Sequence, residues 1–193
     1  SQIKAERAWL IPYFISKEIG GFDFEKLLKL DLNSLKEIFK RKSLHRFYNV
    51  MAGNFYSAIQ LIHTKYNDDA SKIWKNNPSS ATVVRRFREF KGVREKISTM
   101  AANILARDFK IPMQDRICID ISPDVHVKRV FARLGFISKD ASNDELIHCA
   151  RELHPEYPGI FDFSAWEIGR EWCRPKNPDC KNCYMNQFCP KNI

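Results

Sequence analysis

Residues 82–107, TVVRRFREFKGVREKISTMAANILAR, are the stretch that decides the fold. Apolar residues recur at helical spacing at both ends, which predicts a short helix over Thr82–Glu89 and a second helix from Glu95 to about Arg107. The residues between them, Phe90-Lys91-Gly92-Val93-Arg94, include a glycine and suit a tight turn. We therefore predict a helix, a turn and a helix. One apolar face of the second helix is expected to consist of Val93, Ile97, Met100, Ala101, Ile104 and Leu105.

The remaining sequence also favours helices. Residues 24–39 predict two short helices, because capping-type residues near Asp31 interrupt the apolar pattern. Residues 48–66 predict a longer helix, and Ser122-Pro123-Asp124 opens another that ends at Gly135. Only Ile117–Ile121 alternates in a way that suits a strand. The sequence therefore predicts an all-α fold.

The charge of the chain is strongly positive and unevenly distributed. Of 193 residues, 32 are basic and 23 acidic, for a formal charge of +9. Between Val84 and Lys110 there are eight basic residues against three acidic ones. Such a cluster favours a polyanionic partner, and nucleic acid is the natural one because phosphate contacts release counterions. Taken by itself, the charge leaves a solvated basic helix face as the alternative. Charged residues interrupt every apolar run, which excludes a membrane span and a membrane partner.

Four of the six cysteines lie close together near the end of the sequence, at Cys173, Cys180, Cys183 and Cys189. Four thiolates suit either zinc or an iron–sulfur cluster. Zinc ribbons usually present two close cysteine pairs, whereas this segment has a single C-x2-C flanked by longer loops. We therefore expect a cluster, with zinc as the alternative. Disulfides rank below both, because nothing in this basic chain points to an oxidising compartment.

These motifs together resemble one family, the helix-hairpin-helix DNA glycosylases of the endonuclease III type (HhH-GPD). The segment Phe90–Lys96 is similar to the family's Leu-Pro-Gly-Val-Gly-Arg-Lys hairpin, which aligns Lys96 with the nucleophilic lysine of its bifunctional members. Pro123-Asp124-Val125-His126-Val127 resembles Val-Asp-Thr-His, which aligns Asp124 with the catalytic aspartate. The cysteine spacing is that of the family's [4Fe–4S] loop. Ser1-Gln2 resembles the end of a segment whose glutamine fills the gap left by an extruded base.

The resemblance implies a two-lobed, all-helical fold with a C-terminal iron–sulfur loop. We expect one domain over residues 1–118, containing the helix-hairpin-helix at about 82–107, and a second over 119–193. The second domain would end in the cysteine loop, 173–189, which would hold a [4Fe–4S] cluster. A first helix belonging to this fold is expected upstream of Ser1. The residues implied to contact DNA are Gln2, Lys91, Gly92, Val93 and Arg94.

The function that this resemblance implies is base-excision repair. Lys96 would attack the sugar, expel a damaged or mismatched base, typically an oxidised pyrimidine, and form a Schiff base that leads to strand cleavage. Its position in the first turn of a helix, beside Arg94, disfavours the ammonium form. Asp124 would stabilise positive charge on the sugar or relay a proton. We expect a monomer that acts on double-stranded DNA in the cytoplasm, at the nucleoid.

Two other functions stay open at this point. In a monofunctional glycosylase, Asp124 would activate water and Lys96 would only contact DNA. In a non-catalytic iron–sulfur module, the same residues would bind distorted duplex without chemistry. Asp124 considered alone is most simply a helix N-cap, because aspartate favours that position.

The chain also departs from the family pattern. Arg94 replaces the second glycine of the hairpin, which would cost about 1 kcal/mol if that position were left-handed. About ten more residues than usual separate Lys96 from Asp124, over residues 110–122. This insertion is expected near the substrate pocket, so substrate choice is left open.

Overall fold

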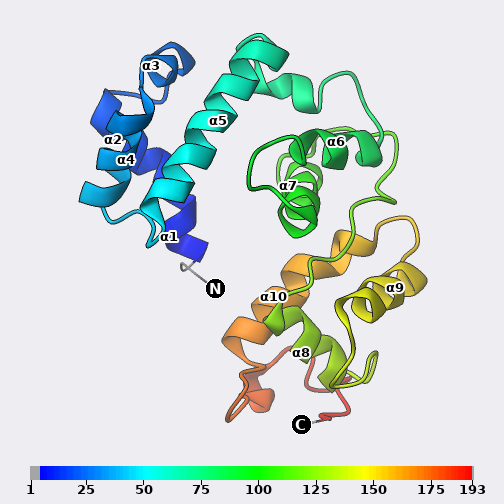
Figure 1. The fold of residues 1–193 in the computed structure, drawn as a ribbon. Helices are drawn as coiled ribbons and strands as arrows, with labels where there is room; N and C mark the ends of the chain where they lie inside the picture. Colours follow the sequence, from blue (N-terminus) through cyan, green and yellow to red (C-terminus); the bar gives the residue numbers. More distant parts are fainter. Residues whose placement is uncertain (1–4, 193) are drawn as a thin grey trace. The chain divides into compact units, whose positions relative to one another are not determined.

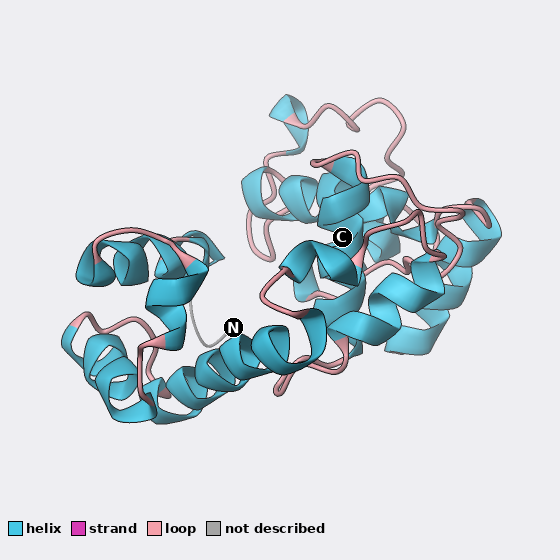
Figure 2. Cartoon of the chain, turned by 90° about the horizontal axis from the view of Figure 1, so that it is seen from above, coloured by secondary structure: helices cyan, strands magenta, loops and turns pink. Residues whose placement is uncertain are grey.

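The computed structural model of the chain describes residues 5–192, with side chains from residue 7. Gln2, which the resemblance assigns to DNA, lies outside the described residues. Over residues 5–192 the chain forms helices and connecting loops, with no strand (Figure 2). The predicted all-α class is confirmed. The segment Ile117–Ile121, the one place where a strand was expected, is irregular.

The contacts divide the chain into two compact units. The first contains the described residues up to Ile73 together with Glu89–Gly92, and the second contains Trp74–Arg88 and the residues from Val93 onward. The predicted boundary after residue 118 falls inside the second unit. Figure 1 labels the helices of each unit.

The first unit is a group of helices around one apolar core. Its elements are α1 (Ala5–Trp9), α2 (Ile11–Ile19), α3 (Phe24–Leu28), α4 (Leu32–Arg41), α5 (Tyr48–Tyr66) and the short 3-10 helix η1 (Ala70–Ile73). Asp31 caps α4 by accepting hydrogen bonds from two backbone N–H groups, which explains the break between the two predicted short helices. The core residues are Ile15, Leu27, Leu35, Ile38, Phe39, Leu44, Ala52 and Ile59.

The second unit carries all the remaining helices. They are α6 (Ser80–Phe87), α7 (Glu95–Arg107), α8 (Val125–Arg133), α9 (Asn143–Leu153), η2 (Pro158–Ile160), α10 (Phe161–Glu171) and η3 (Cys180–Asn182). One core lies mainly among α8, α9 and α10 and includes Val127, Val130, Phe131, Leu146 and Ile168. A second lies under α6 and α7 and includes Val83, Ala102, Leu105, Ala106, Ile119 and Tyr157.

The predicted apolar face of α7 is wrong for most of its residues. Only Leu105 of the six is buried, and Ile97 and Met100 are exposed. The face that is buried carries Ser98, Thr99, Ala102, Asn103, Leu105 and Ala106. Its polar groups have partners: the hydroxyls of Ser98 and Thr99 donate to the carbonyl of Glu95, and Asn103 bonds outside the helix. Because these hydrogen bonds offset the cost of burial, a polar face can pack inward.

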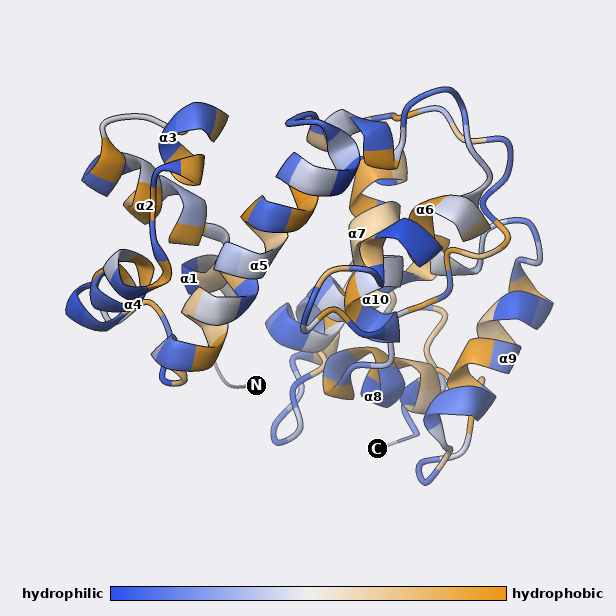
Figure 3. Ribbon diagram, turned by 45° about the horizontal axis from the view of Figure 1, so that its top comes forward, coloured by the Kyte–Doolittle hydropathy of each residue, from blue (hydrophilic) through white to orange (hydrophobic). Residues whose placement is uncertain are grey.

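Hydrophobic and hydrophilic residues alternate along the labelled helices, as expected for helices that each pack one side (Figure 3). From residue 5 to residue 192, no helix combines the length and the apolar character that crossing a bilayer requires.

Candidate active site

The turn before α7 depends on Gly92. Its φ of +84° lies in the left-handed region. A Cβ at this position would lie 2.3 Å from the side-chain nitrogen of Asn54 on α5. In the same turn, Phe90 stacks on Tyr66 with a centroid separation of 6.3 Å, and Glu89 accepts a hydrogen bond from the Tyr66 hydroxyl. The turn is therefore anchored on α5 from both of its ends.

Arg94 follows this turn as the N-cap of α7. Its φ of −106° and ψ of −178° are extended, so the left-handed cost considered for this position does not arise. The side chains of Lys91 and Arg94 are exposed, as a phosphate contact requires. Val93 is half-buried. The DNA contacts of these residues stay predictions.

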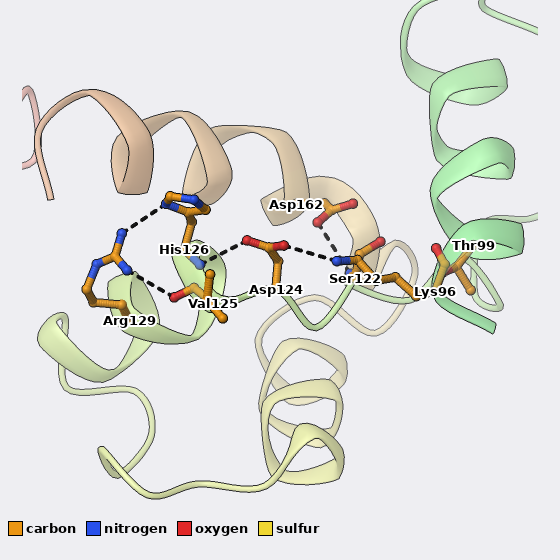
Figure 4. Close-up of polar contacts among 8 residues, drawn as sticks. All are labelled: Lys96, Thr99, Ser122, Asp124, Val125, His126, Arg129 and Asp162. Carbon is orange, nitrogen blue, oxygen red and sulfur yellow. Dashed lines mark hydrogen bonds and ion pairs between the residues drawn. The ribbon is translucent and has the colours of Figure 1, made fainter. Parts of the chain in front are cut away.

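Lys96 and Asp124 meet at the starts of two helices (Figure 4). Lys96 lies in the first turn of α7 and Asp124 immediately precedes α8. The Lys96 Nζ donates to Asp124 Oδ2 at 3.0 Å. The lysine side chain is 45% exposed and the aspartate side chain 25%. The pair is thus open to a ligand on the lysine side and supported by protein on the aspartate side.

The two oxygens of Asp124 have separate partners. While Oδ2 faces Lys96, Oδ1 accepts the backbone N–H of His126 at 2.9 Å and so caps α8. Burial raises the pKa of Asp124, but the hydrogen bond from His126 and the nearby Lys96 ammonium outweigh it, and the pKa is lowered overall. Asp124 is therefore an N-cap and at the same time the partner of Lys96.

Arg129 ties the start of α8 to its surroundings. Its guanidinium bonds to His126 Nδ1 at 2.9 Å and donates to the carbonyls of Cys173 at 2.6 Å and Gly169 at 2.7 Å. A Cβ at Gly169 would lie 2.6 Å from the His126 Cβ, so α10 passes very close to this turn. Burial lowers the pKa of Arg129. Sequence reasoning missed this residue, because nothing in the local pattern indicates which carbonyls it reaches.

A buried, irregular segment leads to Asp124. Ile119, Asp120, Ile121 and Ser122 are between 0% and 7% exposed. Three other elements hold the segment. The N–H of Gly159 donates to the Ile119 carbonyl at 2.7 Å, Arg151 forms a two-pronged ion pair with Asp120, and the N–H of Ser122 donates to Asp162 Oδ1 at 3.3 Å.

Asp162 and Asn103 form a buried polar group that sequence reasoning also missed. Asp162 is 8% exposed and Asn103 is 1% exposed. Asn103 donates to the Gly159 carbonyl at 2.8 Å and accepts a hydrogen bond from the Tyr157 hydroxyl. Burial raises the pKa of Asp162, against hydrogen bonds from Ser122 and Asn103 and the charge of Arg107, which lower it. An aspartate in the first turn of a helix is common, so its position in the sequence carried no signal.

The four C-terminal cysteines gather around one cavity. Cys173, Cys180, Cys183 and Cys189 all line it, and their thiols are free. Its other lining residues include the apolar side chains Val130, Leu134, Ile168, Trp172 and Met185.

Arg133 is a charged residue that bonds to this cluster of thiols. It donates to the Cys173 Sγ at 3.4 Å, and its carbonyl accepts the Cys189 thiol. Burial raises the pKa of Cys183, and its three neighbouring thiols act in the same direction. Within the described part of the chain, no three His, Cys, Asp or Glu side chains are close enough to hold a single metal ion.

Comparisons with known proteins bear on the family. No protein-family model matches the chain. The chain is 34% identical to endonuclease III of Thermotoga maritima over 70 residues, which cover 36% of this chain and about a third of that protein. It is 24% identical over 172 residues to a Methanocaldococcus jannaschii protein named provisionally as a DNA repair glycosylase, covering 85% of this chain and 69% of the relative.

Solved structures with the same fold include endonuclease III bound to DNA and a thymine-DNA glycosylase. A non-covalent endonuclease III–DNA complex superposes with a TM-score of 0.64 at 21% identity, covering 95% of this chain and 76% of the other. A trapped endonuclease III–DNA covalent intermediate gives 0.62 at 19% identity, covering 96% and 74%. A thermostable thymine-DNA glycosylase gives 0.61 at 18% identity, covering 93% and 72%. The resemblance expected from the motifs is therefore confirmed: this chain has the all-helical fold of the endonuclease III-type DNA glycosylases and is similar to them in sequence.

Proposed function

We propose that the protein is a DNA glycosylase of base-excision repair with AP lyase activity. The observation that carries this proposal is the 3.0 Å contact between Lys96 Nζ and Asp124 Oδ2. The two residues are 28 positions apart, and each is brought to the other by the start of a different helix. An amine and a carboxylate at hydrogen-bond distance form a nucleophile and its proton acceptor.

The proposed chemistry uses Lys96 as the nucleophile. After the Lys96 ammonium passes a proton to Asp124, its nitrogen attacks C1′ of the deoxyribose, and the bond from C1′ to the base breaks with its electron pair leaving on the base. The departing base takes the proton from Asp124, which returns to its ionised form. The bond from C1′ to the ring oxygen then breaks, the ring oxygen takes up a proton that the amine loses, and a Schiff base results. This makes the C2′ proton acidic, and its removal expels the 3′ phosphate by β-elimination. Once it has given up the proton from Lys96, the ionised Asp124 also stabilises the positive charge that remains on the sugar.

The hairpin would hold the DNA backbone while this happens. Lys91 and Arg94 flank Gly92 at the surface, and the N-terminus of α7 follows them. Backbone N–H groups at a helix start favour anions, so a phosphate near Gly92 would face both the amide groups and the two cations. A base in a duplex is out of reach of Lys96, so the target nucleotide must be extruded first. The expected partner is double-stranded DNA that carries a damaged or mismatched base, bound by a protein monomer at the cytoplasmic nucleoid.

The cysteine cavity supports a [4Fe–4S] cluster as the cofactor. All four thiols line one apolar cavity, and Arg133 donates a hydrogen bond to one of them, a kind of contact that influences the reduction potential of such clusters. Zinc, which four thiolates also bind in a tetrahedral site, is the alternative cofactor. When bound, the cluster would cross-link the two ends of the loop 173–189. A visible absorption band and about four iron and four sulfide per chain are the expected result, and zinc in their place would contradict it.

Borohydride trapping tests the enzymatic proposal. A duplex with a single abasic site isolates the lyase step from the choice of base. We expect a covalent protein–DNA adduct that is lost in Lys96→Ala and kept in Lys139→Ala, an exposed lysine in the loop between α8 and α9. Base release without an adduct would identify a monofunctional glycosylase that activates water. Binding without either reaction would leave a non-catalytic DNA-binding protein.

A further inference from the structure

We propose that Asp162 is a positioning residue that fixes the segment before α8 against α7 and so holds the Asp124 carboxylate beside Lys96. Asp162 itself has no role in the chemistry proposed above. The inference rests on the proposed function only for its consequence in catalysis. The effect of Asp162 on the placement of the Lys96–Asp124 ion pair does not depend on that function and can be tested separately.

The chain reaches Asp124 through a buried residue. Asp124 follows Ser122 by two residues, and Ser122 is 2% exposed. The buried N–H of Ser122 has Asp162 Oδ1 as its partner at 3.3 Å. Because a buried N–H without an acceptor is unfavourable, removing the carboxylate should release or rotate this peptide. Such a rotation would also move the two residues that follow, Pro123 and Asp124, and with them the Asp124 carboxylate.

Asp162 also faces α7, the helix that carries Lys96. Hydrogen bonding from Asn103 and the charge of Arg107, both on α7, act on the Asp162 carboxyl. Asn103 lies about two helical turns after Lys96. Asp162 therefore bonds to the segment that leads to Asp124 and interacts electrostatically with the helix that carries Lys96. Figure 4 shows Asp162 beside Ser122.

Asp162 differs in its place from the other anchors of the segment. Gly159 and Arg151 hold Ile119 and Asp120, which are further from Asp124 along the chain. Asp162 holds the residue nearest to it. A buried carboxyl is unfavourable unless its contacts compensate, and a neutral amide could accept the Ser122 N–H equally well. The charge of Asp162 is thus not needed for positioning, but an acceptor oxygen at this place is.

The experiment compares three variants of Asp162 with one control. Asp162→Ala removes the acceptor, and Asp162→Ser withdraws it, because the serine hydroxyl is one bond shorter than the carboxylate that reaches the Ser122 N–H at 3.3 Å. The serine variant also keeps a polar group at the start of α10 should the alanine variant fail to fold. Asp162→Asn keeps an acceptor oxygen. Ser142→Ala is the control, because it removes the N-cap of α9 and weakens the same unit without contacting the segment. Each variant is measured below its melting range.

Two readouts are taken on every variant. The first is the pKa of Asp124, followed by 13C NMR of its carboxyl carbon, where Lys96 and His126 are the groups that lower it. The second is the single-turnover rate of borohydride trapping on an abasic duplex at saturating protein. We expect the Ala and Ser variants to raise the Asp124 pKa toward its ordinary value and to slow trapping by about 100-fold, the effect of a small misplacement. Asp162→Asn and Ser142→Ala should match the wild type in both.

The outcomes decide between the alternatives. An unchanged Asp124 pKa in Asp162→Ser would overturn the proposal, and so would an equal loss of trapping in Ser142→Ala, which would indicate general destabilisation. Failure of Asp162→Asn to restore both readouts would also refute it. If the wild-type protein forms no adduct while the Asp124 pKa still rises in Asp162→Ser, the proposed function fails and the positioning role stands.

Discussion

Replacing Asp124 by asparagine and by alanine separates its structural role from its proposed chemical role. Asparagine is about as good an N-cap as aspartate, so Asp124→Asn keeps the bond to the His126 N–H and loses the ion pair with Lys96. Asp124→Ala loses both. Only the carboxylate can accept a proton from the lysine, so the two variants should be equally poor in trapping while they differ in stability.

The size of each effect follows from the contacts. Loss of an N-cap costs about 1 kcal/mol. The ion pair is 45% exposed on the lysine side, and a pair so open to solvent contributes at most about 1 kcal/mol. We expect Asp124→Ala to lose about 1–2 kcal/mol and Asp124→Asn less than about 1 kcal/mol. For a protein of this size, each kcal/mol lowers the melting temperature by roughly 2–4 °C.

The catalytic loss should be far larger. A positioned acid or base contributes on the order of 10²- to 10⁴-fold to a rate. Single-turnover trapping on an abasic duplex should fall by at least about 100-fold in both variants, and thermal melting measures the stability difference in the same preparations. If Asp124→Asn forms the adduct at the wild-type rate, Asp124 is a helix cap only and the proposed proton transfer is refuted.

Three further predictions concern the hairpin and the acidic groups. Lys91→Ala and Arg94→Ala should each reduce the salt slope of DNA binding by about 0.9, one phosphate contact each, and unchanged slopes in filter-binding titrations would remove the hairpin from the interface. Gly92→Ala should cost about 1 kcal/mol from its φ of +84°, and shortening Asn54 to alanine should not restore it in urea melts, because the backbone strain persists. The pKa of Asp162 is raised, so its neutral form stabilises the fold: relative to Asp162→Asn, the wild type should lose stability as the pH rises from about 3.8 through the raised pKa. A difference that stays flat between about pH 4 and 8 would contradict this.

The parts of the fold that the sequence predicted are those controlled by local pattern. The helices over Tyr48–Tyr66 and Glu95–Arg107 lie where periodicity placed them, and Asp124 begins α8 as its capping chemistry suggests. The distance between Lys96 and Asp124 could not come from periodicity. It followed only from the resemblance to a family in which two such residues act together.

The parts that sequence reasoning missed depend on partners from distant elements. The prediction for the inward face of α7 was wrong because a polar residue such as Asn103 was not expected to be buried. Its burial is made favourable by hydrogen bonds with Gly159 and Tyr157, more than 50 residues further along the chain. Asp162 was missed for the same reason. Its importance comes from the Ser122 N–H, 40 residues earlier, and no local pattern contains that contact.

Helix α8 connects the candidate active site with the cysteine loop. Its N-terminus is capped by Asp124, its middle carries Arg129, which holds the Cys173 carbonyl, and its end carries Arg133, which donates to the Cys173 Sγ and to the carbonyls of the two residues after it. The cysteine loop contributes no group to the proposed chemistry. Through its contacts with α8 it nevertheless affects the position of Asp124, the residue that accepts the proton. Arg129 also bonds to the side chain of His126, and the N–H of His126 is the group that Asp124 caps. A shift of Cys173 therefore reaches this N–H through the side chains of Arg129 and His126. The cysteine loop thus acts on the site as a support, and its expected effect is on the placement of Asp124.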